Sequence, residues 1–271
     1  MSRETKKSRR YVLQAAACAC CLAAARPVFA ASGVDADDHV GLPTILELGV
    51  APMTRIAQSV WVAQLTPEVW LYTVTHPVGG FVYPANGLIV TAADGGVLID
   101  TGWTPEHAVT LTQWAARERN VKIDLAVATH FHDDRTGGVD ALRDLGVRCV
   151  AHPLTTRLAR EHGYRIPDPL PGFDREAYRL NNHCELYYGG GGHTRDNIVV
   201  WLPDARLLYG GCFLKSATAA DLGYLGDAVV ADWAASLAKV QARYPDPDII
   251  VPGHGALKGD SIGRTRALLT F

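Results

Sequence analysis

The chain has no strong excess of charge of either sign. Its 26 Lys and Arg residues nearly balance 28 Asp and Glu residues, which gives a formal net charge of −2. Nucleic-acid-binding domains usually carry a basic face or stripe, so this balance gives no reason to expect a nucleic-acid partner. The chain also shows no short internal repeat, and its composition is neither that of a disordered segment nor that of a coiled coil.

Long hydrophobic runs are equally scarce. An Ala-rich apolar run covers residues 12–25, but a helix that crosses a bilayer needs roughly 20 residues. Basic residues precede this run, and Val28-Phe29-Ala30 follows it as a small-x-small cleavage site. This order is that of a secretory signal peptide, so we expect residues 1–30 to be removed. An uncleaved membrane anchor is the alternative.

The residues Ser8-Arg9-Arg10-Tyr11 resemble a twin-arginine export signal. Arginine pairs also arise by chance in basic N-terminal regions, so the general secretory route stays open. We expect a periplasmic monomer without a membrane anchor after cleavage. The expected parts of the chain are a signal peptide (1–30), an N-terminal leader segment (31–57) and one folded domain (58–271).

Cysteine is scarce once the signal peptide is set aside. Of six cysteines, three fall within the first thirty residues, and those that remain are Cys149, Cys184 and Cys212. An odd number of cysteines in an exported protein suggests a reactive thiol or a metal ligand. Cys149 and Cys184 either form a disulfide in an oxidising compartment or stay as two separate buried thiols, and the sequence leaves both open.

Hydrophobic residues make up 48% of the chain, which is enough for one large core. Short apolar or alternating runs broken by Pro and Gly indicate strands, at 60–64, 69–75, 86–91, 96–100, 125–129, 147–151, 185–188, 198–202, 206–209 and 249–251. Helical patterns cover 104–120, 138–145, 232–243 and 261–269. Strands and helices interleave without a linker, so the pattern favours an α/β or α+β fold built in layers.

Two helix starts and one loop can be read in more detail. Thr104 and Asp232 are expected to cap the helices that begin beside them. Residues 76–84 separate two expected strands and hold two adjacent glycines together with the aromatic residues Phe81 and Tyr83. We expect this segment to form a hairpin loop with a partly apolar tip.

Four segments hold side chains that commonly bind metal, namely 129–135 (THFHDDR), 191–197 (GGHTRDN), 210–215 (GGCFLK) and 251–255 (VPGHG). Each of them follows an expected strand. Separate strands would therefore deliver imidazoles, a thiolate and a carboxylate to one edge of a sheet. Residues i and i+2 point the same way on an extended chain, so His130 and His132 can grip one ion, and Asp134 continues this spacing.

Imidazole, thiolate and carboxylate are the protein ligands of zinc, and a catalytic zinc keeps one position open for water. A single histidine would more often belong to the core, and Cys212 alone would more often be a buried structural thiol. Four histidines, a cysteine and an aspartate near strand ends are hard to explain without a metal. The set therefore predicts a zinc site.

This pattern resembles the metallo-β-lactamase family over residues 58–271. The His-x-His-x-Asp run, the later His and the Pro-Gly-His-Gly run are shared across that hydrolase superfamily. The resemblance implies an αββα sandwich, with two central mixed sheets flanked by helices, and makes residues 58–271 the catalytic domain. Arg135 after the motif aspartate and Cys212 at the later position resemble class B, subclass 1, and His130 stands where the single-zinc subclass has Asn.

The resemblance implies two zinc ions per chain, one held by His130, His132 and His193 and the other by Asp134, Cys212 and His254. The implied activity is hydrolysis of the β-lactam ring of penicillins, cephalosporins and carbapenems, which confers antibiotic resistance. Zinc can lower the pKa of a bound water to roughly 7. We expect this water to attack the lactam carbonyl while Asp134 orients it.

Further roles follow from the same resemblance. Lys215 would pair with the carboxylate that β-lactams carry next to the ring nitrogen, unless it is an ordinary surface lysine. Tyr224 stands where family members often carry Asn, and its hydroxyl either donates to the lactam carbonyl or only packs. The loop 76–84 would close over the apolar part of the substrate. Candidates for holding the ligands in place, with surface ion pairing as the alternative, are Asp100, Arg135 and Asp227.

Two other functions are considered. One is a hydrolase of the same fold that acts on a thioester, lactone or phosphodiester, against which Cys212, Arg135 and Lys215 argue. The other is a zinc-binding or redox protein without catalysis. Such a protein would fill every coordination position with its own ligands, whereas the ligand count here leaves positions for water. Loop shape decides which β-lactams are preferred, and the sequence leaves that preference open.

Overall fold

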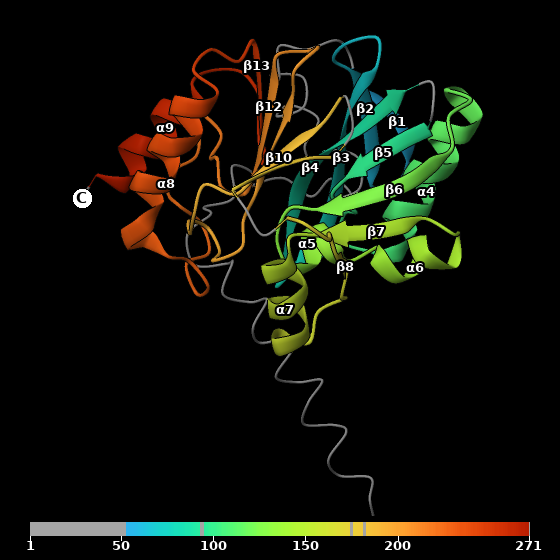
Figure 1. Ribbon diagram of the computed structural model, residues 1–271. Helices are drawn as coiled ribbons and strands as arrows, with labels where there is room; N and C mark the ends of the chain where they lie inside the picture. Colours follow the sequence, from blue (N-terminus) through green and yellow to red (C-terminus); the bar gives the residue numbers. More distant parts are fainter. Residues whose placement is uncertain (1–52, 93–94, 174–175, 181–182, 271) are drawn as a thin grey trace, which may run out of the picture.

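The computed structural model describes residues 53–92, 95–173, 176–180 and 183–270, so the predicted signal peptide and most of the predicted leader lie outside the described residues. In the described part, two β-sheets face each other and helices cover their outer faces (Figure 1). The predicted αββα sandwich is thereby confirmed. Within the described ranges, no helix combines the length and the apolar character that a membrane span requires.

The first sheet has eight strands that follow one another in chain order. They are β1 (Thr54–Ala57), β2 (Val60–Gln64), β3 (Val69–Val78), β4 (Phe81–Ala92), β5 (Gly95–Ile99), β6 (Ile123–Ala128), β7 (Arg148–Ala151) and β8 (Asp168–Pro169). The first five strands pair antiparallel, and β5 to β8 pair parallel. Strand β1 falls within the segment expected as a leader, so the sheet begins before residue 58.

The second sheet has five strands in the order β13-β12-β11-β10-β9. They are β9 (Ala177–Arg179), β10 (Glu185–Tyr187), β11 (Val199–Leu202), β12 (Leu207–Gly211) and β13 (Ile249–Pro252). The described helices are α4 (Pro105–Glu118), α5 (Asp133–Thr136), α6 (Val139–Asp144), α7 (Pro153–His162), α8 (Val230–Arg243) and α9 (Ser261–Leu269). Helices α4 and α6 lie against the first sheet, and α8 and α9 lie against the second (Figure 1).

Side chains alternate along each strand, so the core has one cluster between the two sheets and one beneath the helices on each outer face. Leu71 and Leu88 of the first sheet point inward to a cluster that also contains Val200 and Val251 of the second. Their neighbours point outward, and Ile89 packs in the cluster beneath α4. Both faces of the central strands are thus buried, which explains why the strand sequences are almost continuously apolar.

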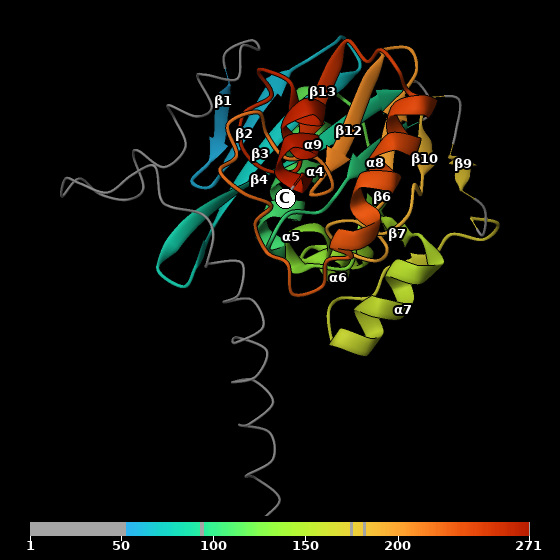
Figure 2. The same ribbon diagram turned by 90° about the vertical axis from the view of Figure 1, so that its left-hand side faces the viewer.

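The segment 76–84 forms the predicted hairpin, but most of it is strand and not loop. Strands β3 and β4 continue through it and leave only Gly79 and Gly80 as a two-residue turn. Both glycines have positive φ angles, of 57° and 87°, as the tight turns of such hairpins require. Pro77 and Pro84 suggested a break, but a proline is tolerated in a strand where no N–H is needed for pairing. The resulting hairpin extends from the body of the molecule (Figure 2).

The predicted helix starts have mixed outcomes. Helix α4 begins at Pro105, and the Thr104 side chain accepts a hydrogen bond from the His107 N–H, so this cap is confirmed. Helix α8 begins at Val230 without a side-chain cap, so the prediction that Asp232 caps it is wrong. Asp232 instead lies in the first turn, where its charge still favours the positive end of the helix dipole.

The two cysteines that might have paired are separate. Cys149 and Cys184 are both buried, no disulfide joins them to each other, and they belong to different core clusters. The disulfide alternative is therefore wrong, and the two side chains act as small apolar residues. Burial raises the pKa of each thiol to about 12, so neither is an active nucleophile near neutral pH.

Candidate metal centre

The predicted metal-binding segments meet at one edge of the sandwich. His130 and His132 directly follow β6, Cys212 follows β12, and His254 follows β13. His193 comes from the segment between β10 and β11. Parallel strands end at the same edge of a sheet, which is why residues far apart in the sequence come together here.

Three imidazole rings form one half of the cluster. The rings of His130, His132 and His193 lie 4.8, 5.0 and 5.2 Å apart between centres. His130 Nε2 lies 3.2 Å from His132 Nδ1, so these nitrogens face the same small space. Burial lowers the pKa of His130 and of His193 well below the usual value, which keeps both rings neutral and able to bind a metal.

A carboxylate, a thiol and an imidazole form the other half. The Nε2 atom of His254 lies 3.1 Å from Cys212 Sγ and 3.2 Å from Asp134 Oδ2. The Pro84 carbonyl accepts a hydrogen bond from His254 Nδ1, which turns Nε2 toward the cluster. Burial acts to lower the pKa of His254, but Cys212 and Asp134 outweigh it and raise the pKa to about 9. Cys212 and Asp134 therefore favour a positive charge beside them.

The donor atoms fit zinc in kind and in spacing. Three sets of donor atoms each lie within 4.8 Å of one another: His130–His132–Asp134, His130–His193–Cys212 and Asp134–Cys212–His254. Asp134 and Cys212 each belong to one set with His130 and also to the set with His254, so they join the two halves. The expected reason for the position of Asp134 is wrong, however, because this residue lies in α5 and not on an extended chain.

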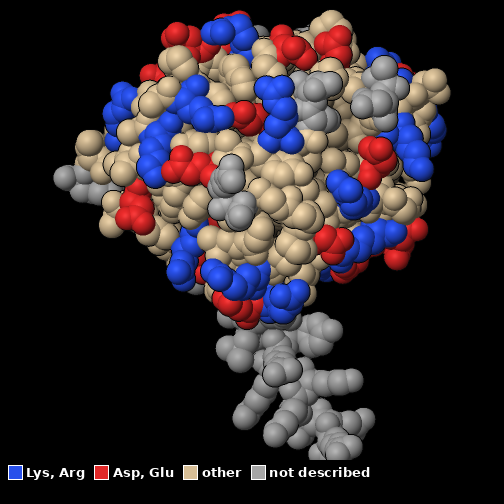
Figure 3. All heavy atoms as spheres, in the orientation of Figure 1, with Lys and Arg blue, Asp and Glu red and all other residues tan. Residues whose placement is uncertain are grey.

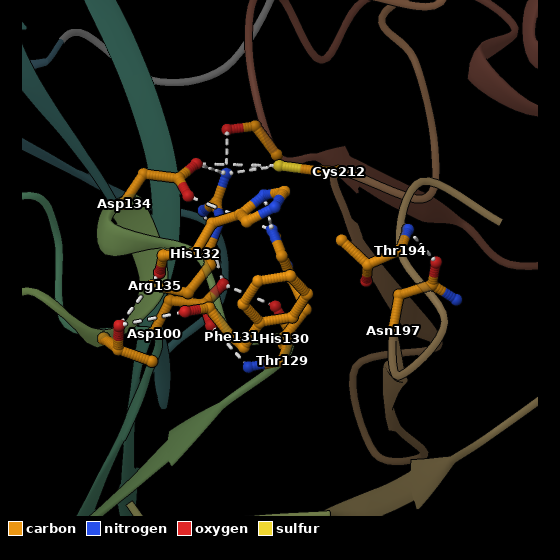
Figure 4. A network of polar contacts seen from close by, with 12 residues as sticks. Asp100, Thr129, His130, Phe131, His132, Asp134, Arg135, Thr194, Asn197 and Cys212 are labelled. Carbon is orange, nitrogen blue, oxygen red and sulfur yellow. Dashed lines mark hydrogen bonds and ion pairs between the residues drawn. The ribbon is translucent and has the colours of Figure 1, made fainter. Parts of the chain in front are cut away.

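Arg135 has no exposed surface and contacts all three groups of the second half, Asp134, Cys212 and His254 (Figure 4). Its Nη2 atom contacts Asp134 Oδ2 at 2.9 Å and donates to Cys212 Sγ at 3.0 Å. Burial acts to raise the pKa of Asp134, but the charge of Arg135 and a hydrogen bond from His254 hold it well below its usual value. Asp134 is therefore an ionised acceptor at neutral pH.

Asp100 holds the start of the histidine segment in place through hydrogen bonds to Thr129. Its carboxylate accepts hydrogen bonds from the Thr129 N–H at 2.8 Å and from the Tyr209 hydroxyl at 2.6 Å. Arg135 Nη1 lies 3.3 Å away. The backbone of Asp100 is left-handed, with a φ of 64°, a strained conformation for a residue other than glycine. Because Asp100 and Arg135 are completely buried, surface ion pairing does not explain them.

Two supporting residues were not predicted from the sequence. The Asn86 side chain donates to the Pro252 carbonyl at 3.0 Å and to the Gly255 carbonyl at 2.9 Å, which ties β4 to the segment that carries His254. Tyr209 bonds Asp100 from the opposite sheet. The only sequence signal was a polar group inside an apolar strand, which is too weak to assign a partner.

The remaining predicted residues lie around this cluster. Asp227 Oδ2 lies 3.0 Å from His132 Nε2. Lys215 Nζ lies 5.3 Å from the centre of the Trp233 ring, and its charge adds to the effect of burial in lowering the pKa of His193. The ring of Tyr224 lies 5.7 Å from that of His132. The structure thus brings all the predicted site residues to one region.

The imidazole, thiolate and carboxylate donors at one edge of this two-sheet sandwich are those of a zinc protein. Residues 80–254 match the model of the metallo-β-lactamase superfamily. The chain is 36% identical over 195 residues to a type 2 metallo-β-lactamase of Bacillus cereus, with 72% of this chain and 76% of the relative covered. It is 35% identical over 211 residues to that of Bacteroides fragilis, with 77% and 84% covered.

Solved structures agree with this match. A metallo-β-lactamase from Erythrobacter litoralis superposes with a TM-score of 0.76 at 35% identity, covering 80% of this chain and 98% of the other. A Pseudomonas aeruginosa enzyme solved in a mono-zinc form gives 0.73 at 31% identity, covering 81% and 96%. The chain therefore belongs to the metallo-β-lactamase family.

Proposed function

We propose that this chain hydrolyses the β-lactam ring of antibiotics with zinc and so confers resistance to them. The observation that carries this function is the cluster of three overlapping donor sets, which share His130, Asp134 and Cys212, at the edge of the sandwich. The relatives from Bacillus cereus and Bacteroides fragilis bear the name metallo-β-lactamase, and they match across most of their length. The substrates proposed are penicillins, cephalosporins and carbapenems.

The proposed metal content is two zinc ions per chain. His130, His132 and His193, whose rings lie 4.8 to 5.2 Å apart between centres, would hold one ion. The other would be held by Asp134, Cys212 and His254, whose donor atoms all lie within 4.8 Å of one another. When bound, zinc polarises a carbonyl oxygen and lowers the pKa of a bound water to roughly 7. A structural zinc site takes four protein ligands, whereas each set here has three, which leaves room for water or substrate.

The chain's own groups then order the reaction. Hydrolysis adds the oxygen of water to the lactam carbonyl carbon, breaks the ring C–N bond and leaves the proton of that water on the ring nitrogen. Asp134 is ionised and accepts a hydrogen bond, so its role would be to orient the attacking water. Lys215 lies at the rim near His193 and would bind the substrate carboxylate as a point charge.

The β3–β4 hairpin would cover the apolar part of the substrate. Its base is joined to the centre through the hydrogen bond between Pro84 and His254. Near its tip, Phe81 keeps 42% of its surface exposed, although a large apolar side chain is more stable out of water. A substrate side chain lying against Phe81 would bury this surface.

Export and assembly complete the proposal. The basic and apolar N-terminal segment with its small-x-small site supports a cleaved signal peptide and a periplasmic location. We propose a monomer without a membrane anchor after cleavage. Mass spectrometry of protein from the periplasmic fraction tests cleavage after Ala30, and light scattering tests the monomer.

The function is tested by a panel of substrates with the zinc-loaded chain. We expect hydrolysis of a penicillin, a cephalosporin and imipenem, and no comparable turnover of a thioester, a lactone or a phosphodiester. Metal analysis of the same sample should give two zinc ions per chain. Failure with all three β-lactams at full zinc loading would contradict the proposed function, and turnover of one of the other esters would favour a different hydrolase of this fold.

A further inference from the structure

His132 is held from two sides. Its Nδ1 atom faces His130 Nε2 at 3.2 Å, and its Nε2 atom faces Asp227 Oδ2 at 3.0 Å. A neutral imidazole carries one proton, so a lone pair on Nδ1 requires the proton to be on Nε2. Asp227 is the acceptor that fixes this form of the ring, because a carboxylate on the far nitrogen both orients a ligand histidine and raises its basicity.

Tyr224 is the second partner of Asp227. Its hydroxyl hydrogen-bonds to the Asp227 carboxylate. The Tyr224 ring also packs beside the His132 ring, with 5.7 Å between centres. Asp227 therefore has its two partners on neighbouring side chains.

The backbone beside Tyr224 is shaped for this arrangement. A Cβ atom at Gly226 would lie 2.2 Å from the Tyr224 hydroxyl oxygen and 2.4 Å from its Cζ atom. Only glycine at this position leaves room for the ring to fold back over the backbone toward Asp227. The position of the hydroxyl is thus set by the loop that leads into α8, and it does not depend on a bound substrate.

We propose that Tyr224 is a positioning residue for the metal centre: its hydroxyl donates to Asp227, and Asp227 in turn orients His132. This inference rests on the proposed zinc site. It assigns the hydroxyl proton to Asp227 and not to the lactam carbonyl, which separates Tyr224 from the role expected of an Asn at this place in the sequence. Without the hydroxyl, Asp227 could rotate away and His132 would lose its fixed orientation.

The test measures zinc affinity by competition with a chromophoric chelator, in the absence of any β-lactam. The variants are Tyr224→Phe, Asp227→Ala and the double variant. Loss of a carboxylate that supports a ligand typically costs about tenfold to 100-fold in metal affinity, which we expect for Asp227→Ala. Tyr224→Phe is one bond further from the metal, so we expect a smaller loss of about threefold to tenfold.

The double variant distinguishes the route. If Tyr224 acts through Asp227, the double variant binds zinc as weakly as Asp227→Ala alone, because the two changes share one pathway. Tyr188→Phe is the matched control, since its hydroxyl donates to the Arg195 carbonyl at 2.8 Å, and its zinc affinity should equal that of the unchanged chain. The melting temperature of each zinc-free variant checks that it is folded.

Two results would overturn the inference alone. One is an unchanged zinc affinity in Tyr224→Phe with a lower kcat, which would place the hydroxyl on the substrate. The other is an additive loss in the double variant, which would separate Tyr224 from Asp227. If the unchanged chain itself failed to bind zinc, the proposed function would fall together with this inference.

Discussion

At the scale of single residues, a guanidinium with no exposed surface is balanced by two buried carboxylates. Arg135 contacts Asp134 at 2.9 Å and Asp100 at 3.3 Å. Burial raises the pKa of Asp100 to about 6 even with Arg135 beside it. Removal of one partner from a buried ion pair leaves the other charge without compensation, which makes such positions sensitive.

We therefore predict that Arg135→Ala lowers the free energy of unfolding of the zinc-free chain by about 3–5 kcal/mol. Urea unfolding in the presence of a chelator measures this change. Arg195→Ala is the control, because Arg195 is exposed and its loss should change the free energy by no more than about 0.5 kcal/mol. Equal stabilities for the two variants would contradict the central position given to Arg135.

Lys215 gives a second prediction at this scale. A contact between a charged donor and a carboxylate is worth about 1.5–3 kcal/mol. Lys215→Ala should therefore lower kcat/KM for a penicillin by about tenfold to 100-fold, mainly through KM, because this contact forms in the bound substrate as well as in the transition state. Lys258→Ala, at an exposed position, is the control. An unchanged KM in Lys215→Ala would make this residue an ordinary surface lysine.

At the scale of elements, α7 begins with a histidine as its cap. His152 Nδ1 accepts the Leu154 N–H at 3.1 Å, which requires this nitrogen to be unprotonated. Burial lowers the pKa of His152 from 6.5 to about 4. The unfolded chain therefore takes up a proton at a higher pH than the folded chain does, so stability falls as the pH drops through this range.

We predict that the zinc-free chain loses stability between pH 6.5 and pH 4, and that His152→Asn makes this loss smaller. Asparagine keeps a cap acceptor but does not titrate. Urea unfolding at several pH values gives the slope for both proteins. His107 contributes a loss of the same sign, because burial lowers its pKa to about 4, so some slope should remain. An identical slope in His152→Asn would show that the cap does not titrate as described.

The β3–β4 hairpin gives a prediction for substrates. Phe81→Ala should raise KM for benzylpenicillin, which carries an aromatic side chain, by about threefold to tenfold because apolar contact area is lost. It should leave KM for 6-aminopenicillanic acid, which has no such side chain, nearly unchanged. Leu145→Ala at the end of α6, where the side chain is 46% exposed, is the control. Equal effects on the two substrates would contradict a role for Phe81 in side-chain binding.

The same elements show what the sequence could and could not predict. Strand β2 and helix α9 have the bounds that the sequence predicts, because a regular residue pattern and clear boundary residues mark each of them. Helix α7 was missed, because its cap His152 is not one of the usual capping residues and because Thr155 and Thr156 favour strands in isolation. Burial of Leu158 and Ala159 against Phe131 stabilises it, and this packing is a tertiary property that a local pattern does not contain.

Some features of the metal centre could likewise be predicted from the sequence, and others could not. The residues that could hold a metal were predictable because their types and spacing are chemically specific. The contact between His132 and Asp227 spans 95 positions in the chain and joins two irregular segments, so no periodicity announces it. The roles of Asn86 and Tyr209 could not be predicted either, because Asn86 bonds a distant backbone carbonyl and Tyr209 bonds a carboxylate from the other sheet.

At the scale of the whole molecule, the metal centre lies on the seam between the two sheets. Arg135 donates to the Asn86 carbonyl on one sheet and to the Gly253 carbonyl beside the other. On the face drawn in Figure 3, positive and negative side chains are interspersed, without a large patch of one sign. Because the metal centre lies between the sheets, the stability of the fold should depend strongly on whether zinc is bound there.

We predict that zinc raises the melting temperature of the zinc-free chain. A ligand at about 1,000 times its Kd stabilises the folded state by about 4 kcal/mol, which corresponds to about 8–16 °C for a domain of this size. Calorimetry with added zinc and with added magnesium measures the effect, and magnesium should have little because it prefers oxygen ligands. Equal shifts with both ions would contradict a specific zinc centre.

Turnover of one β-lactam before and after metal removal tests the central claim most directly. The purified chain is assayed with imipenem as prepared, after a zinc chelator, and after zinc is returned in excess of the chelator. Zinc-dependent hydrolysis predicts turnover that the chelator abolishes and added zinc restores. Turnover that persists in the chelator after metal analysis shows no zinc, or no turnover at full zinc loading, would contradict the account.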